Sequence, residues 1–332
     1  MAAGRPIGKD ALPDSLSREL NQARTGGSSA GPYRLGRFNR SSHNMLGFLA
    51  SVIDGVLVGF VYGLAAMGLT LIWGVMDVVN LTHGAMIVCG MFGLYALTNV
   101  LGIPVYAALL PVLVGGFIVG VGLYWLAIHR VVGRPSLMSL LSTFSVNLVL
   151  VGLGTAVLGT GLFNVDVSVP GFSLGRYTFP GAHIVAAILA AIIAYGLYLF
   201  LHRAKTGKAV RAVASNREAA ELVGIPTTRV LAVTVGTGVA SAAVAGMLIA
   251  TLFPFTVLSG DDYTLKSFVV TVLGGFGNPL GALFAGVALG VLEGAVTPFV
   301  PVSWTLVIEF ALFVVALIAF PGGLFASRRG AL

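Results

Sequence analysis

Charged residues are scarce in this sequence. They make up 9% of the 332 residues, whereas hydrophobic residues make up 57% and the mean hydropathy is +0.97. A soluble domain carries about 25% charged residues. A chain this depleted cannot cover a surface that faces water, so lipid must be its solvent. The scarcity of charge therefore excludes an ordinary soluble protein.

Motifs for catalysis are also missing. The single cysteine, Cys89, lies in an apolar run, so no disulfide framework exists. The sequence has no His/Cys/Asp cluster with metal-ligand spacing and no plausible Ser/His/Asp arrangement. Residues 206–209 lack the first glycine and the final hydroxyl of a phosphate-binding loop. We therefore predict no catalytic residue, no metal site and no cofactor in this chain, and we do not expect an enzyme.

The net charge of +7 does not indicate a nucleic-acid partner, because seven of the 19 basic residues lie in the first 44 positions. Residues 1–44 read as a polar tail that we expect to be disordered. No signal peptide is visible, since the first apolar run begins near Leu46. Met45 as the true start is an alternative, so whether the tail belongs to the native protein stays open.

Hydrophobic segments fill the rest of the chain, and they predict an all-α polytopic membrane domain over residues 46–325. Most of them reach the ~20 residues needed to cross a bilayer. Residues 264–277 are too short and are followed by a Gly- and Pro-rich stretch, which predicts a half-helix and a break near 274–279. We expect a second break near 77–83. The eight or nine segments are 55–75, 81–100, 104–128, 137–160, 181–202, 229–252, 264–277, 280–297 and 303–320.

Two basic loops predict the orientation of the chain. The largest covers about residues 203–228 and should be cytoplasmic, together with the loop that contains His129, Arg130 and Arg134. The side of the N-terminal tail stays open, because span parity places it outside and its basic charge favours the inside. In the late segments, small residues recur every four positions and predict close helix packing; they are Ala282, Gly286, Gly290 and Gly294.

The large basic loop contains the most informative motif. Residues 211–225 alternate apolar and charged positions, which predicts a short amphipathic helix that Gly224 and Pro226 terminate. An ordinary solvated helix is the alternative. Glu218-Ala219-Ala220, with Gly224 four residues later, resembles the EAA loop of ABC importer permeases. That resemblance implies a coupling helix that docks on a separate ATPase subunit.

A second stretch narrows the resemblance to the branched-chain amino acid ABC transporter permease family. Residues 80–84 (Asn-Leu-Thr-His-Gly) are similar to the junction of that family's first two helices, with Thr82 where alanine is commonest and Ala85 where an acid is frequent. Residues 272–282 and 320–325 are also similar, so the resemblance covers about 46–325. It implies an ABC importer permease fold in a bacterial inner membrane. It also implies a second homologous permease, two ATPase subunits that bind ATP, and an extracytoplasmic substrate-binding protein.

Polar residues between and within the spans are candidates for the translocation pathway. Because unpaired polar groups are costly in the membrane, they must face each other, water or substrate. Bracing of a helix break and interhelical hydrogen bonding are the structural alternatives. Glu293 and Glu309 are two isolated intramembrane acids that are also candidates. The pathway candidates are Asp77, Asn80, Thr82 and His83 at the first junction, with Ser142, Thr143, Ser145 and Asn147 in the fourth span, where Ser139 shares a three-residue spacing with Ser142 and Ser145.

The sequence therefore predicts the permease subunit of an ATP-driven ABC importer for branched-chain amino acids or similar small polar solutes. A homo- or heterodimeric permease pair is left open, as is urea or a short amide in place of the amino acid. An ion-coupled secondary transporter is the alternative from another class, although intramembrane ionisable groups are few. An integral membrane enzyme is disfavoured by the missing catalytic motifs.

Overall fold

A computed structural model of the chain describes residues 40–174 and 177–319. The chain divides into Met1–Asn44 and Met45–Leu332, and the fold described below is that of the second unit. Two segments discussed above lie outside the described residues: most of the predicted tail and the 320–325 motif.

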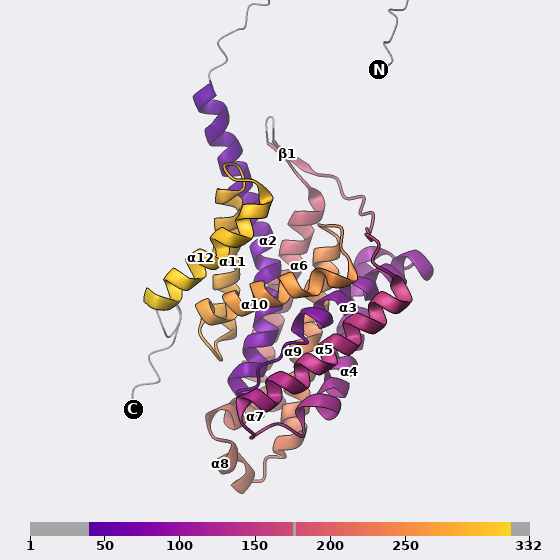
Figure 1. Cartoon of the computed structure of the whole chain (residues 1–332), viewed down its shortest axis with the longest axis vertical. Coiled ribbons are helices and arrows are strands. Elements are labelled where there is room, and N and C mark those ends of the chain that lie inside the picture. Colours follow the sequence, from indigo (N-terminus) through magenta and orange to yellow (C-terminus); the bar gives the residue numbers. More distant parts are fainter. Residues whose placement is uncertain (1–39, 175–176, 320–332) are drawn as a thin grey trace, which may run out of the picture. The chain divides into compact units, whose positions relative to one another are not determined.

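Helices make up most of the described chain (Figure 1). Short helical turns η1 (Ala96–Val100), η2 (Val105–Ala108), η3 (Tyr124–Ile128) and η4 (Val257–Ser259) extend or precede some of them. The helices are α2 (Arg40–Met76), α3 (His83–Tyr95), α4 (Leu109–Leu123), α5 (Ser136–Leu158), α6 (Gly181–Arg203), α7 (Lys205–Ser215), α8 (Arg217–Leu222), α9 (Thr227–Ala250), α10 (Gly260–Gly274), α11 (Pro279–Val296) and α12 (Val302–Ala319).

Each predicted hydrophobic segment is matched by a helical segment, which confirms the all-α polytopic fold. Within the described ranges, seven of these helices are long and apolar enough to cross a membrane. The predicted count of eight or nine is higher because it includes α10 and α12. With 15 residues, α10 is the half-helix that the sequence predicts. The strands β1 (Phe172–Leu174) and β2 (Tyr177–Phe179) pair antiparallel in the connection between α5 and α6.

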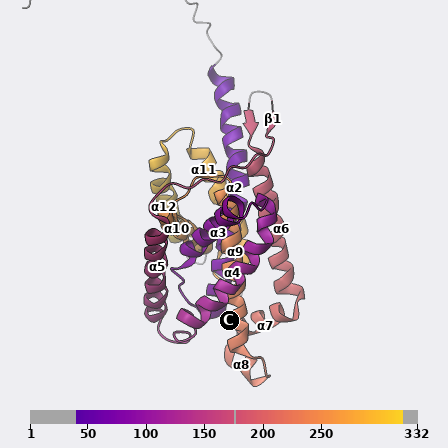
Figure 2. The same ribbon diagram turned by 90° about the vertical axis from the view of Figure 1, so that its right-hand side faces the viewer.

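The two ends of the bundle differ. Helices α7 and α8 lie together at one end, and the β1–β2 hairpin lies at the other (Figures 1 and 2). The loop between η3 and α5 is at the α7–α8 end, so the two basic loops share one side, as predicted. The part of α2 that follows Met45 starts at the opposite end, in agreement with span parity.

Small residues bring the central helices into contact. α9 is buried over most of its length and packs against α3 and α4. The predicted stripe on α11 packs on a matching stripe of α2, because a Cβ on Gly290 would lie 2.1 Å from the carbonyl oxygen of Gly55 and one on Gly286 2.3 Å from the Cα of Gly63. Backbones this close require glycine on both sides. The stripe is therefore a packing surface, as predicted.

Both predicted breaks are present, and they are neighbours. α2 ends at Met76 and α3 begins at His83; α10 ends at Gly274 and α11 begins at Pro279. A Cβ on Gly74, in the last turn of α2, would lie 2.3 Å from the Cα of Gly277, so the second break packs against the end of α2. At the second break Gly275 has φ +86°, a conformation that favours glycine. The second break therefore lies next to the helix end that leads into the first.

Candidate functional site

The first candidate site is the break between α2 and α3. Asn80, Thr82 and His83 are fully buried there, whereas Asp77 is exposed and has φ +52°. The backbone N–H of Thr82 donates to the side-chain oxygen of Asn80 at 3.2 Å, and the Thr82 hydroxyl donates to the same oxygen. Three of the four predicted residues are therefore brought together, and Asp77 lies at the edge of the break.

Two polar atoms in this break have no partner among the described residues. Nε2 of His83 lies 3.0 Å from the carbonyl oxygen of Ala65 on α2. Because a carbonyl only accepts hydrogen bonds, Nε2 carries the proton and Nδ1 is an acceptor. Both Nδ1 of His83 and Nδ2 of Asn80 are buried without a partner. Such groups cost about 1–3 kcal/mol each when nothing satisfies them, so this break offers one donor and one acceptor to water or to a solute.

Helix α5 holds the break in place through one threonine. The Thr143 hydroxyl lies 3.0 Å from the carbonyl oxygen of Val79 and 2.9 Å from that of Ser139, and accepts from the backbone N–H of Leu81 at 3.2 Å. Thr143 is fully buried. A single side chain therefore fixes the backbone on both sides of Asn80, which is the bracing alternative for this residue.

The inward face of α5 is polar. Its buried residues are Ser139, Thr143 and Asn147, four residues apart. Ser142 is half-buried and donates to the carbonyl oxygen of Ala127, while Ser145 is exposed and donates to that of Leu141. Each residue turns a helix by about 100°, so residues three positions apart do not point in the same direction. After two such steps the side chain has left the buried face. The shared face that the sequence suggested for Ser139, Ser142 and Ser145 is therefore not the inward one.

Replacing Thr143 with valine tests the bracing role. Valine has nearly the same shape but cannot bond Val79 and Leu81, so we expect the unfolding free energy to fall by about 1–3 kcal/mol. Thermal unfolding of the purified chain measures the loss. Ser145→Ala is the matched control, because its exposed hydroxyl bonds only within α5. Equal stability of the Thr143→Val and Ser145→Ala variants would contradict the assignment.

Ionised side chains form a second cluster among α10, α11 and α12. The ammonium of Lys266 lies 3.1 and 3.2 Å from the two carboxylate oxygens of Glu293 and 3.5 Å from Glu309. It also lies 4.7 Å from the ring centroid of Tyr62. Glu309 is 3% exposed. The two acids that look isolated in the sequence therefore share one cation, and Lys266 is a candidate that the sequence reading missed.

A cavity with two acidic side chains in its lining adjoins this cluster. It has a volume of about 270 Å³, and Asp54, Tyr62 and Glu293 contribute to its lining. Asp54 on α2 also pairs with His183 on α6, at 2.6 Å. Ionisable groups inside a membrane domain are costly unless they pair or face water. Here they do both, so the cavity is a candidate mouth of the translocation pathway.

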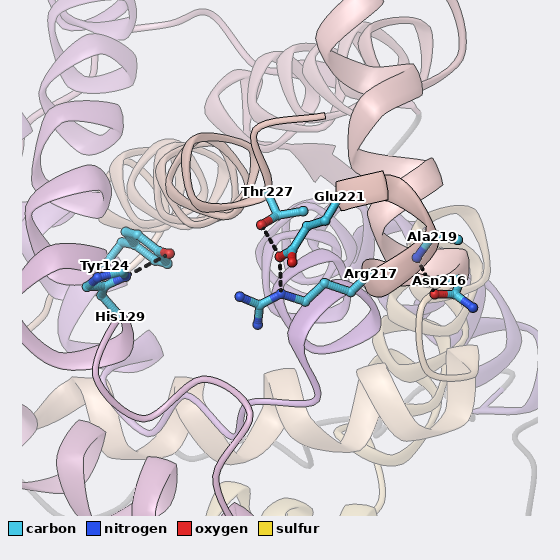
Figure 3. Close-up of polar contacts among 7 residues, drawn as sticks. All are labelled: Tyr124, His129, Asn216, Arg217, Ala219, Glu221 and Thr227. Carbon is cyan, nitrogen blue, oxygen red and sulfur yellow. Dashed lines mark hydrogen bonds and ion pairs between the residues drawn. The ribbon is translucent and has the colours of Figure 1, made fainter. Parts of the chain in front are cut away.

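The third candidate site is the α7–α8 segment (Figure 3). The sequence predicts one amphipathic helix over 211–225, but the structure divides it at Asn216, whose backbone is extended. The Asn216 side chain accepts from the backbone N–H of Ala219 at 2.9 Å and so caps α8. Glu221 accepts from the Thr227 hydroxyl at 2.6 Å and pairs with Arg217 at 3.4 Å. The Thr227 hydrogen bond, with a smaller contribution from Arg217, lowers the pKa of Glu221.

These contacts attach α8 to the start of α9. The residues at the end of α8, Leu222 and Val223, form an apolar tip. Ala220 is buried against its own chain, whereas Glu218 and Ala219 are exposed. Leu222 and Val223 are 89% and 76% exposed. Gly224 follows with φ +83°, and its N–H donates to the carbonyl oxygen of Glu221. Helix α8 lies at one end of the bundle (Figure 1), and Tyr124 and His129, whose side chains are 3.2 Å apart, lie near it (Figure 3).

Comparison with known proteins places this geometry in a family. The model of the family described as the branched-chain amino acid transport system permease component matches residues 51–317. The chain belongs to this permease family. It is 29% identical to the high-affinity branched-chain amino acid transport permeases LivH of Salmonella typhimurium and of Escherichia coli, over 85% of this chain and 97% of each relative. No solved structure matches the chain.

Two other relatives are also similar to this chain. The permease is 26% identical to the high-affinity branched-chain amino acid permease BraD of Pseudomonas aeruginosa, over 83% of this chain and 95% of the relative. It is also 28% identical to the fructose import permease FruG of Bifidobacterium longum, but over only 37% of this chain. All three candidate sites lie within the matched residues 51–317. Family membership makes this chain a transport component of a membrane, not an enzyme.

Proposed function

We propose that this permease is the membrane-spanning subunit of an ATP-driven ABC importer that moves branched-chain amino acids across the bacterial inner membrane. The observation that carries the proposal is the apolar tip of α8. An exposed apolar surface on the water-facing side of a protein marks a contact for a partner. Because α8 joins α7 to the buried α9, movement of a docked ATPase would reach the centre of the bundle.

The partners follow from the same proposal. ATP would be bound by separate ATPase subunits that receive α8, a second homologous permease would complete the pathway, and an extracytoplasmic binding protein would deliver the solute. The relatives that match most of the chain are named for branched-chain amino acids, which supports these substrates over the fructose of the partial match. Urea and short amides remain the competing solutes.

Disrupting the tip tests the docking role. The double change Leu222→Asp with Val223→Asp should weaken retention of the ATPase subunits about thirtyfold, since residues at the centre of an interface contribute about 2 kcal/mol or more. Co-purification of the tagged permease with its ATPase subunits measures this retention. Leu101→Asp is the control, because Leu101 is 66% exposed in the connection between η1 and η2, outside the α7–α8 segment. Unchanged retention in the double variant would refute docking through α8.

An ion-coupled carrier is the second candidate, favoured by the Lys266 cluster. Uptake into vesicles separates the two functions. The proposed importer requires ATP and binding protein for leucine uptake and continues without an ion gradient. Uptake that follows an ion gradient and ignores ATP would establish the carrier instead.

A further inference from the structure

A further cavity lies apart from the helix breaks and the Lys266 cluster and reaches the start of α7. It has a volume of about 680 Å³ and is bounded by α4, α6 and α9, with Thr206 of α7 at one end. Among the lining residues no side chain is charged. The hydroxyls of Thr237 and Ser241 already donate to carbonyl oxygens of α9, at 2.7 and 2.8 Å. This groove therefore offers an apolar ligand a large surface and offers a zwitterion no counter-charge.

The length of the groove is close to the thickness of one membrane leaflet, and its flanks are exposed. Along α6 its lining runs from Phe200 to Ile192, which is a rise of about 12 Å at 1.5 Å per residue. Half of a hydrocarbon core of ~30 Å is about 15 Å. The flanking side chains Val114 and Ile192 are 48% and 60% exposed, so the groove faces lipid. Its length fits one leaflet, the one on the side of α7.

Positive charge gathers where the groove reaches that surface. Helix α7 is seated against the groove, because a Cβ on Gly207 would lie 2.1 Å from the carbonyl oxygen of Phe200. Arg203, Lys205 and Lys208 are exposed around this point. The first turn of α7, which the structure describes completely, contains no acidic residue. The positive end of the helix dipole adds to the charge of the side chains.

We propose that this groove binds one anionic phospholipid of the α7-side leaflet. An acyl chain would lie between α4 and α6, and the headgroup phosphate would lie against Lys205 and Lys208. An apolar channel of leaflet length that ends in basic side chains is complementary to this class of lipid. The site is independent of the proposed substrate. Since α7 leads directly into α8, the bound lipid also supports the position of the coupling segment.

Native mass spectrometry of the purified full chain tests the proposal. The chain is exchanged into nanodiscs that contain phosphatidylglycerol and phosphatidylcholine in equal amounts, and the lipids retained after release are counted. We expect phosphatidylglycerol to be retained preferentially. Lys205→Gln with Lys208→Gln should reduce its affinity about thirtyfold, because each basic group near an anionic headgroup contributes about fivefold. Arg134→Gln, which removes an exposed charge in the other basic loop, should leave retention unchanged.

Filling the groove provides the second arm. A Cβ on Gly196 meets no atom within 4 Å, so Gly196→Phe can occupy the groove without disturbing the helices. This variant should lose the retained phosphatidylglycerol. Gly122→Phe is the control on α4, at a position that is equally open but outside the groove. Equal retention of both lipids, or full retention in Gly196→Phe, would overturn the proposal. Loss of ATPase docking would not overturn the proposal, because the bound lipid is counted on the purified permease without its ATPase subunits.

Discussion

Replacing Gly224 with valine is expected to abolish substrate-stimulated ATP hydrolysis by the assembled transporter. Gly224 has φ +83°. A β-branched residue in this region is strained by about 1–3 kcal/mol, which is enough to rebuild a turn that only a few hydrogen bonds hold. The N–H of Ile225 donates to the carbonyl oxygen of Ala220 at 3.0 Å and the N–H of Gly224 to that of Glu221. Loss of this cap would change the direction in which α8 enters α9.

Two controls separate strain from bulk. Gly224→Asn adds a side chain of similar size, but asparagine tolerates positive φ, so we expect it to retain most of the stimulated hydrolysis. A Cβ at Gly224 would meet no atom of this chain within 4 Å, so crowding within the permease cannot explain a loss. Gly102→Val introduces comparable strain in the connection between η1 and η2, where φ is +67°. Substrate should still stimulate ATP hydrolysis in the Gly102→Val variant.

The assay measures ATPase retention, basal hydrolysis and substrate-stimulated hydrolysis in the same preparation. If Gly224→Val keeps the ATPase subunits but loses stimulation, α8 transmits the signal. If it loses the subunits as well, the turn positions the docking tip. Normal retention with normal stimulation and uptake would contradict the coupling role of this segment.

The helices were predictable because lipid imposes a length and a composition that can be read directly from the sequence. Breaks at 77–82 and 275–278 were predictable for a related reason, since Asp77 and Asn80 interrupt the first apolar run and two glycines and an asparagine interrupt the second. The α11 stripe was predictable from its four-residue spacing. Asn216 could have been recognised as the start of α8, because asparagine is a preferred N-cap.

Features that depend on the partner of a side chain could not be predicted. Ser139, Ser142 and Thr143 all lie on α5, and which of them faces inward depends on how α5 packs against the break. Leu222 and Val223 follow the amphipathic pattern of α8, which by itself places such residues against the protein. Their exposure follows from the turn at Gly224 and from the attachment of Glu221 to Thr227.

The Lys266 cluster was missed for the same reason. Lys266 lies in a short apolar segment, 27 residues before Glu293. A usable signal was nevertheless present, since a lysine and two acids occur in three consecutive membrane segments. Charges at membrane depth seldom remain unpaired. This rule identifies Lys266, Glu293 and Glu309 as possible partners. Their arrangement could not be predicted, because it depends on how α10, α11 and α12 pack against one another.

Replacing Lys266 with methionine is expected to destabilise the chain more than any other single change at an ionised residue discussed above. Methionine preserves much of the volume of the side chain but leaves Glu293 and Glu309 without their cation. Removing one partner of a buried ion pair costs about 3–5 kcal/mol, because the remaining charge is uncompensated. The loss should be near the upper end, since Glu309 is 3% exposed and Tyr62 also loses a cation–π contact.

Thermal unfolding of the purified chain measures this effect, and a second substitution identifies its cause. Adding Glu309→Gln to Lys266→Met removes the most buried of the remaining charges, so the double variant should recover part of the lost stability even though it is changed twice. Arg134→Met, at an exposed position, should change the unfolding free energy by less than about 0.5 kcal/mol. If the double variant were less stable than Lys266→Met alone, lost packing rather than unpaired charge would explain the cluster. Because Glu293 also lines the cavity next to this cluster, leucine uptake by the rescued double variant then shows whether the cation serves transport in addition to stability.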